Sequence, residues 1–113
     1  MKKLLLLALL SLSLVVTGCI NMPTRSAQIT GAYVSEYEYE GMKCDRLAAE
    51  LNSLTRREAQ LVAAQEQRYS SSKVQAFWIG FGRGDGIEAA ELAQVRGQIE
   101  AIMRMRDVKK CKS

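Results

Sequence analysis

Two amphipathic stretches of equal length, each bounded by a cysteine, constrain the fold of this chain more than any other feature. From Cys44 to Tyr69 there are 26 residues, and from Gly86 to Cys111 there are also 26. At about 1.5 Å per residue, each stretch would form a helix about 39 Å long. Two such helices joined by a turn bring both cysteines to the same end. We therefore predict an all-α fold, a two-helix antiparallel hairpin.

The apolar residues of both stretches repeat at helical spacing. We expect one helix from Asp45 to about Ser70, with leucines spaced by four, three and seven residues, and a second from Gly86 to about Lys110, with apolar residues spaced by three, four and three. In the antiparallel register, the numbers of facing residues add up to about 156. The two apolar stripes then meet in pairs: Leu51 with Met105, Leu54 with Ile102, and Leu61 with Val95.

Local signals indicate where these helices end. The serines at 70–72 are expected to end the first helix. Asp85, followed three residues later by Glu88, is typical of an N-cap for the second helix. Gly97 is a poor helix former, and we expect its small size to let a neighbouring helix approach closely.

The loop between the helices is apolar and rich in glycine. It holds the only Trp and both Phe residues, with four glycines at alternate positions from 80 to 86. The glycines match neither a Walker A loop nor a dinucleotide-binding pattern, and Asp85 alone does not make a calcium loop. Two interpretations stay open: the apolar residues fold back over the core, or they form a tip that enters a bilayer interface or a partner's groove. The tip residues are Phe77, Trp78, Ile79 and Phe81.

The first residues of the chain are typical of a secretory signal. Two lysines precede an uncharged, leucine-rich run, Leu4–Val16, which is shorter than the about 20 apolar residues that span a bilayer. The run ends in Val16-Thr17-Gly18-Cys19. This motif resembles the lipobox of bacterial lipoproteins, the substrates of signal peptidase II. The resemblance implies that residues 1–18 are a signal peptide and that a diacylglycerol is attached to the sulfur of Cys19.

With Cys19 lipidated, Cys44 and Cys111 remain as a pair. The envelope outside the cytoplasm oxidises thiols, so we predict a disulfide between them, in agreement with the hairpin. The 66 residues between them exclude a CxxC redox motif. Pairing with a second chain is the competing possibility. Closing a loop of this size within one chain should stabilise the fold by roughly 4 kcal/mol.

Charge and composition argue against several functions. The chain has 16 basic and 12 acidic residues; without the two lysines of the signal the net charge falls from +4 to +2, which does not indicate nucleic-acid binding. The chain contains no histidine, the commonest general base and metal ligand. We therefore expect no enzyme activity, no catalytic residues, no metal and no cofactor.

The segment between the lipobox and the first helix is expected to serve as an anchor. We assign residues 19–43 to a lipidated N-terminus and tether, and residues 44–113 to the helical hairpin domain. Tyr33, Tyr37 and Tyr39 alternate with glutamates at nearly the period of a strand. We expect these tyrosines to pack back on the domain.

Several short motifs follow one another along the chain. They are Tyr33-Val34-Ser35, Tyr39, Cys44-Asp45-x-Leu47, Phe77-Trp78, Glu91-Leu92-Ala93 with Gly97, and Lys110-Cys111. In this combination, over residues 29–111, the chain resembles a group of small uncharacterised Gram-negative envelope lipoproteins. Members of the group often carry a longer apolar centre with a proline after the Trp, where this chain has Ile79-Gly80.

These features favour a non-enzymatic binding or structural module anchored to the outer membrane and facing the periplasm. Ile20 follows Cys19, rather than the Asp that retains lipoproteins in the inner membrane. The alternative is a small lipoprotein inhibitor or exclusion factor that blocks an envelope enzyme or a conjugation machine. Expected partners are the membrane, through the lipid anchor, and an envelope protein of unknown identity. A homo-oligomer is also expected, because one hairpin leaves apolar helix surface uncovered. No nucleic-acid partner is expected.

Overall fold

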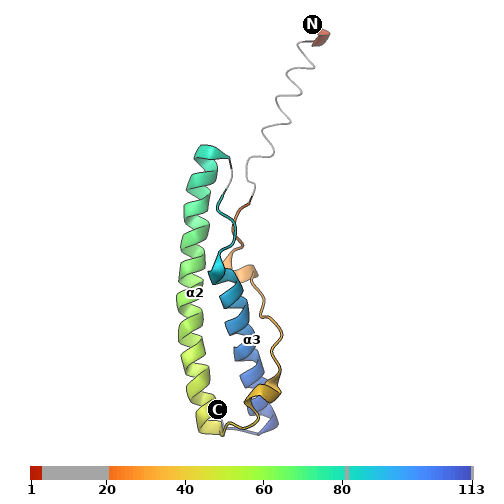
Figure 1. Ribbon diagram of the computed structural model, residues 1–113, viewed down its shortest axis with the longest axis vertical. Helices are drawn as coiled ribbons and strands as arrows, with labels where there is room; N and C mark the ends of the chain where they lie inside the picture. Colours follow the sequence, from red (N-terminus) through yellow and green to blue (C-terminus); the bar gives the residue numbers. More distant parts are fainter. Residues whose placement is uncertain (4–20, 81, 113) are drawn as a thin grey trace.

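The protein is built on two long antiparallel helices, as the sequence predicts. The computed structural model describes residues 1–3, 21–80 and 82–112. Helix α2 (Cys44–Ile79) and helix α3 (Ile87–Val108) lie side by side (Figure 1). The described residues contain no β-strand. The all-α hairpin expected from the spacing of the cysteines is therefore confirmed.

Residues 21–43, which we call the N-terminal segment, run along α3 from one end of the hairpin to the other (Figure 1). The segment is mostly extended. It includes two single turns of 3-10 helix, η2 (Ser26–Gln28) and η3 (Glu36–Tyr39). It therefore forms a third element beside the two long helices.

A disulfide joins α2 to the residues that follow α3. The sulfur atoms of Cys44 and Cys111 are 2.01 Å apart and their Cα atoms 5.5 Å apart, a separation that bridging allows. Cys44 is the first residue of α2. Lys110, with a left-handed backbone at φ 54°, lies between the end of α3 and Cys111 and turns the chain. The expected disulfide within one chain is confirmed.

Two clusters of buried side chains form the core between α2 and α3. The cluster nearer the disulfide includes Leu47, Ile102 and Met105, all fully buried. The second cluster lies further along the hairpin and is built on Leu61 and Leu92. Each pair expected to face each other falls within one of these clusters: Leu51 with Met105, Leu54 with Ile102, and Leu61 with Val95.

Helix α2 is longer than the sequence analysis predicted. It runs through the serines at 70–72 and ends at Ile79. Serine is only a weak helix breaker, and the Ser72 hydroxyl is buried, where it accepts a hydrogen bond from the N–H of Arg83 (3.2 Å). The helix stops at Gly80, which takes a left-handed backbone at φ 85°. The prediction of equal helices is therefore wrong: α2 has 36 residues and α3 has 22.

Asp85 does not cap α3, contrary to our prediction. The N-cap residue is Gly86, and no side chain caps this end. The Asp85 carboxylate accepts hydrogen bonds from Thr24 of the N-terminal segment instead. Glu88, expected to complete the cap, forms an ion pair with Arg68 of α2 (3.2 Å). A local pattern cannot reveal these distant partners, which compete with the cap for both carboxylates.

The N-terminal segment is packed against the helices rather than free, although we expected residues 19–43 to form a tether. Val34 and Tyr39 are buried in the cluster nearer the disulfide. Of the three tyrosines expected to pack on the domain, only Tyr39 does so, whereas Tyr33 and Tyr37 are exposed. The 3-10 turn of η3 breaks the strand-like alternation within Glu36–Tyr39, so Tyr37 and Tyr39 point to different sides.

Gly97 admits the N-terminal segment, not a neighbouring helix as we expected. It is buried on α3, and a Cβ at this position would overlap the carbonyl oxygen of Ala32. The N–H of Ala32 donates to the carbonyl of Ala93 (2.8 Å). A Cβ on Gly31 would lie 3.0 Å from the Gly97 nitrogen. Two glycines thus let an extended backbone lie directly on the helix.

We expect replacement of both Cys44 and Cys111 by serine to lower the free energy of unfolding by about 4 kcal/mol. The reason is that the bridge restricts the unfolded chain over a separation of 67 residues. Thermal unfolding of oxidised, reduced and double-variant protein measures the effect, and the reduced wild type should match the variant. An oxidised protein that migrates as a covalent dimer would contradict the bridge within one chain.

Gly97→Ala should destabilise the protein by about 1–3 kcal/mol, the usual cost of overpacking. The sign is diagnostic, because glycine to alanine inside an unobstructed helix stabilises by about 1 kcal/mol. Urea denaturation measures the change. Gly41→Ala is the control, since nothing lies within 4 Å of a Cβ at that position, and it should leave stability almost unchanged. A stabilised Gly97→Ala protein would show that the N-terminal segment does not lie on α3.

Candidate functional site

Helix α2 continues past α3 at the end of the hairpin away from the disulfide. Arg68 of α2 pairs with Glu88 in the first turn of α3, so the two helices are level at Arg68. Residues from Tyr69 to Ile79 continue beyond this point (Figure 1). Their length is about 16 Å at 1.5 Å per residue. This stretch has no helical partner among the described residues.

Extended backbone covers one side of this free stretch. Gly82 lies on Ser72, where a Cβ on Gly82 would come within 3.1 Å of the serine Cβ and 2.9 Å of the sulfur of Met22. Gly84 has a positive φ of 70°, and a Cβ there would lie 2.6 Å from Oδ1 of Asn21. The small residues after α2 and the first residues of the N-terminal segment therefore lie together against the helix.

The opposite side of the free stretch carries exposed apolar side chains. Phe77 is 82% exposed and Trp78 77%, and their rings meet edge to face with centroids 5.4 Å apart. Val74 precedes them by three and four residues, the spacing of one helix face, and is also exposed. Ile79, the last residue of the helix, lies on the face of Ser72 and Ala76 but is exposed as well. We call these four residues, Val74, Phe77, Trp78 and Ile79, the α2 tip.

The α2 tip belongs to a helix, whereas we expected it on a glycine turn. The side chains of Val74, Phe77 and Trp78 are exposed on the face away from the buried Ala76 rather than folded back over the core. Ala76, on the inward side of the same turns, is buried. Because the helix continues to Ile79, its backbone fixes where the aromatic side chains leave the helix surface.

Only positive charge flanks the α2 tip. From Tyr69 to Gly84 the sequence contains Lys73 and Arg83 but no acidic residue. Both side chains are exposed. The Lys73 ammonium lies 6.0 Å from the centre of the Tyr69 ring, and Nε of Arg83 donates to the amide oxygen of Gln75 (3.1 Å). The end of the molecule is therefore apolar and basic together.

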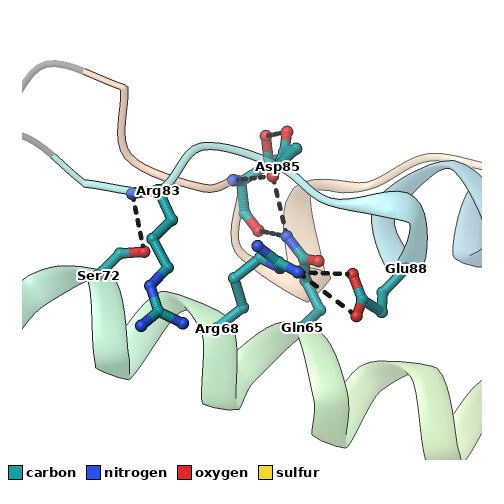
Figure 2. Close-up of polar contacts among 7 residues, drawn as sticks. Gln65, Arg68, Ser72, Arg83, Asp85 and Glu88 are labelled. Atoms are coloured by element: carbon teal, nitrogen blue, oxygen red, sulfur yellow. Dashed lines mark hydrogen bonds and ion pairs between the residues drawn. The ribbon is translucent and has the colours of Figure 1, made fainter.

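A polar cluster below the α2 tip fastens the N-terminal segment to the helices. The Thr24 hydroxyl donates to Oδ2 of Asp85 (2.6 Å), and the Thr24 N–H donates to Oδ1. Gln65 of α2 is fully buried and donates from Nε2 to Asp85 Oδ1 (2.9 Å) and to the Thr24 carbonyl (2.6 Å). Figure 2 shows Gln65 and Asp85 facing each other from α2 and the returning chain. One carboxylate thus ties three parts of the chain together.

The same cluster lowers the pKa of Asp85. Its partial burial alone would raise the pKa, but the hydrogen bonds from Thr24 and Gln65 and the positive charge of Arg68 outweigh that effect. Hydrogen bonds to the ionised carboxylate favour the charged form. The cluster is therefore formed at neutral pH with Asp85 ionised.

A second carboxylate holds the next residues of the N-terminal segment. The N–H and hydroxyl of Ser26 both donate to Oε1 of Glu66 (2.9 and 2.6 Å). These hydrogen bonds are the largest cause of the lowered pKa of Glu66, and the charge of Arg25 adds to them. On the neighbouring helix, Arg96 donates from Nη1 to the carbonyl of Ser26 (2.6 Å) and from Nε to Glu58 (2.8 Å). Side chains from both helices therefore hold this part of the segment.

The sequence-predicted site residues fall at opposite ends of the hairpin. Phe77, Trp78 and Ile79 lie at the free end of α2, far along the helix from the bridge between Cys44 and Cys111 (Figure 1). The remaining two, Cys19 and Phe81, lie outside the described residues. The disulfide is thus structural, and the α2 tip is separate from it.

Sequence reasoning missed Thr24, Ser26, Gln65 and Glu66. One signal could have been used for Gln65: it follows Leu61 by four residues and so continues the buried stripe of α2. A buried glutamine requires polar partners. The partners of Gln65 are 20 and 41 residues away along the chain, and the partner of Glu66 is 40 residues away, which no helical periodicity reveals.

A hollow beside the polar cluster is lined by Ala64, Gln67, Arg68, Ser71, Arg83 and Glu88. Arg68 pairs with Glu88, and Ser72 accepts from Arg83, as Figure 2 shows. In residues 1–3, 21–80 and 82–112, no group of three or more Cys, Asp or Glu side chains is placed to hold a metal ion. None of the helices formed by the described residues has the length and apolar character of a membrane span.

No protein-family model, no curated protein and no solved structure matches this chain.

Asp85→Asn should weaken attachment of the N-terminal segment and lower the free energy of unfolding by about 1 kcal/mol at pH 7. Hydrogen bonds to a charged group contribute more than this when buried, and exposure reduces the effect. The folded pKa of Asp85 lies below its ordinary 3.8. The carboxylate therefore stabilises above that value, and its contribution is lost as pH falls through the folded pKa.

Urea denaturation from pH 7 into the acid range tests this expectation. The difference between wild type and Asp85→Asn should shrink as the pH falls, because protonated Asp85 no longer supplies the charge. Asp107→Asn is the matched control, since its side chain is exposed and makes no hydrogen bond or ion pair with the described residues. An Asp85→Asn effect that stays constant into strong acid would show that the charge is unimportant.

Proposed function

We propose that the chain is a lipoprotein of the bacterial outer membrane that acts as a non-enzymatic binding or structural module on the periplasmic side. Residues 1–18 are removed as a signal peptide, and Cys19 carries the lipid. This assignment rests on the resemblance of Val16-Thr17-Gly18-Cys19 to the lipobox. The weaker resemblance over residues 29–111 to small envelope lipoproteins agrees with it.

The observation that most supports the proposal is how soon the folded part begins after the lipobox. Within residues 21–80 and 82–112, the part of the chain that the structure describes after the lipobox, Asn21 already lies against Gly84 and Met22 against Gly82. Only Ile20 separates Asn21 from Cys19. A domain joined so closely to a lipid is held next to the membrane surface, which suits a structural or binding role there.

The α2 tip is the surface we assign to binding. Trp and Phe are enriched in protein interfaces, and Trp also at membrane–water interfaces, and here Phe77 and Trp78 are exposed in the last turn of α2. We extend the proposal to self-association through α3, where Ile87, Met103 and Val108 are exposed. Pairs of hairpins can cover such residues in a four-helix arrangement.

Cys19→Ala should abolish membrane anchoring. Without the sulfur, no thioether to diacylglycerol forms and signal peptidase II does not cut. Membrane fractionation and intact-mass measurement test this: the wild type should be in the outer membrane with the mass of a lipidated chain starting at residue 19. The variant should be unprocessed or soluble. Cys44→Ser with Cys111→Ser, which keeps the lipobox, is the control and should stay lipidated. Unchanged mass and location for Cys19→Ala would overturn the proposal.

Crosslinking in intact cells identifies what the module binds. A photoreactive residue at Met103 samples the exposed face of α3, and one at Val74 samples the α2 tip. Products with a second copy of the chain, a porin or peptidoglycan support the structural module. A stoichiometric enzyme target would instead favour a lipoprotein inhibitor.

A further inference from the structure

We propose that the α2 tip inserts into the interface of the same membrane that holds the lipid on Cys19. The domain then stands on the membrane with the end of α2 directed into it and the disulfide end directed away. This inference rests on the proposed lipid anchor and adds a second membrane contact, made by Val74, Phe77, Trp78 and Ile79.

Chain length allows the lipid on Cys19 and the α2 tip to reach the same membrane. The start of the N-terminal segment lies at the base of the tip, because Met22 and Ser72 both contact Gly82. From Ser72 to Ile79 the helix rises about 10 Å. Consecutive Cα atoms are about 3.8 Å apart, so Cys19 lies within about 8 Å of Asn21. The lipid-bearing residue can therefore lie at the same depth as the tip.

The exposed side chains of the α2 tip are of the kinds that favour a membrane interface. Tryptophan prefers the headgroup level of a bilayer, where its ring is partly apolar and its N–H can hydrogen-bond. Phe77 and Val74 share a helix face with Trp78 and extend the apolar surface. Val74 and Ile79 are about 7.5 Å apart along the axis of α2. The tip is therefore long enough to enter the headgroup level but too short to cross the hydrocarbon core of about 30 Å.

The charges beside the α2 tip also favour contact with a membrane. Lys73 and Arg83 are exposed beside the tip, and no acidic residue lies between Tyr69 and Gly84. Basic side chains at this level would meet lipid phosphates, and anionic lipids attract them. The nearest acidic residue after the tip, Asp85, is turned toward Thr24 and Gln65. The membrane-facing end therefore presents no negative charge to the lipid.

The disulfide end of the hairpin does not share these properties. Glu36, Glu38 and Glu40 lie in or beside η3, so this end carries a group of carboxylates. Lys109 donates to the carbonyls of Glu40 and Met42, so its charge is engaged within the protein. Of the two ends, only the tip is both apolar and free of acidic residues.

The single tryptophan makes the inference directly measurable. Trp78 is the only Trp of the chain, so its fluorescence reports on the tip alone. The lipidated protein is reconstituted in vesicles of phosphatidylethanolamine and phosphatidylglycerol whose acyl chains are brominated at different depths. We expect Trp78 emission at shorter wavelength than a water-exposed tryptophan. Bromine near the headgroup should quench it more strongly than bromine near the chain ends.

Two variants serve as controls. Trp78→Phe with Tyr37→Trp moves the probe to an exposed position at the disulfide end. That protein should float with the vesicles, and its emission should be unaffected by brominated lipid. Val74→Asp with Phe77→Asp keeps Trp78 and changes only exposed side chains. It should still float through its lipid but lose most of the quenching.

The vesicle experiment distinguishes failure of tip insertion from failure of the lipid anchor. If the wild type floats while Trp78 stays accessible to acrylamide in the water and is not quenched by brominated lipid, the inference is overturned and the anchor stands. The α2 tip would then be assigned to binding a protein partner instead of the membrane. If the correctly processed protein does not float at all, the proposed function fails and the inference fails with it.

Discussion

The bond between Cys44 and Cys111 holds the start of α2 and the chain after α3 with Cα atoms 5.5 Å apart, and this fixes how the helices align. From that point the apolar stripes meet in order, with Leu51 near Met105 and Leu61 near Val95. A difference in helix length must then appear at the other end. Since α2 has 36 residues and α3 has 22, the free end of α2 follows from the alignment that the disulfide imposes.

Two helices alone cover only one side of each other, and the N-terminal segment supplies the third side of the core. Near the disulfide it does so with apolar residues, Val34 and Tyr39. Toward the free end of α2, where α3 no longer provides apolar partners, the contacts become polar. Gln65 occupies the next buried position of α2 after Leu61. Its amide donates to the N-terminal segment and to Asp85. Polar partners thus replace apolar ones near the first turn of α3.

Much of this fold could be predicted from the sequence, because the disulfide and the hairpin depend on periodicity and chain length alone. The length of α2 could not, since Ser72 is helical here through burial and a hydrogen bond from Arg83, and serine has no strong preference of its own. The cap at Asp85 failed for a related reason: Thr24, 61 residues away, takes the carboxylate. The sequence indicated the apolar tip, but its exposure depends on the end of α2, which the sequence did not locate.

The short connection between Cys19 and the folded part also explains how a tip of four side chains is enough for membrane insertion. On the proposed function, the lipid supplies the membrane affinity, and tip insertion becomes an event within one molecule. The effective concentration of a linked site falls as its linker lengthens. Here only Ile20 lies between Cys19 and Asn21, and Thr24 and Ser26 are already fastened by Asp85 and Glu66. Four apolar side chains held beside an existing anchor therefore need little affinity of their own, whereas the same side chains on a long tether would spend most of their time in water.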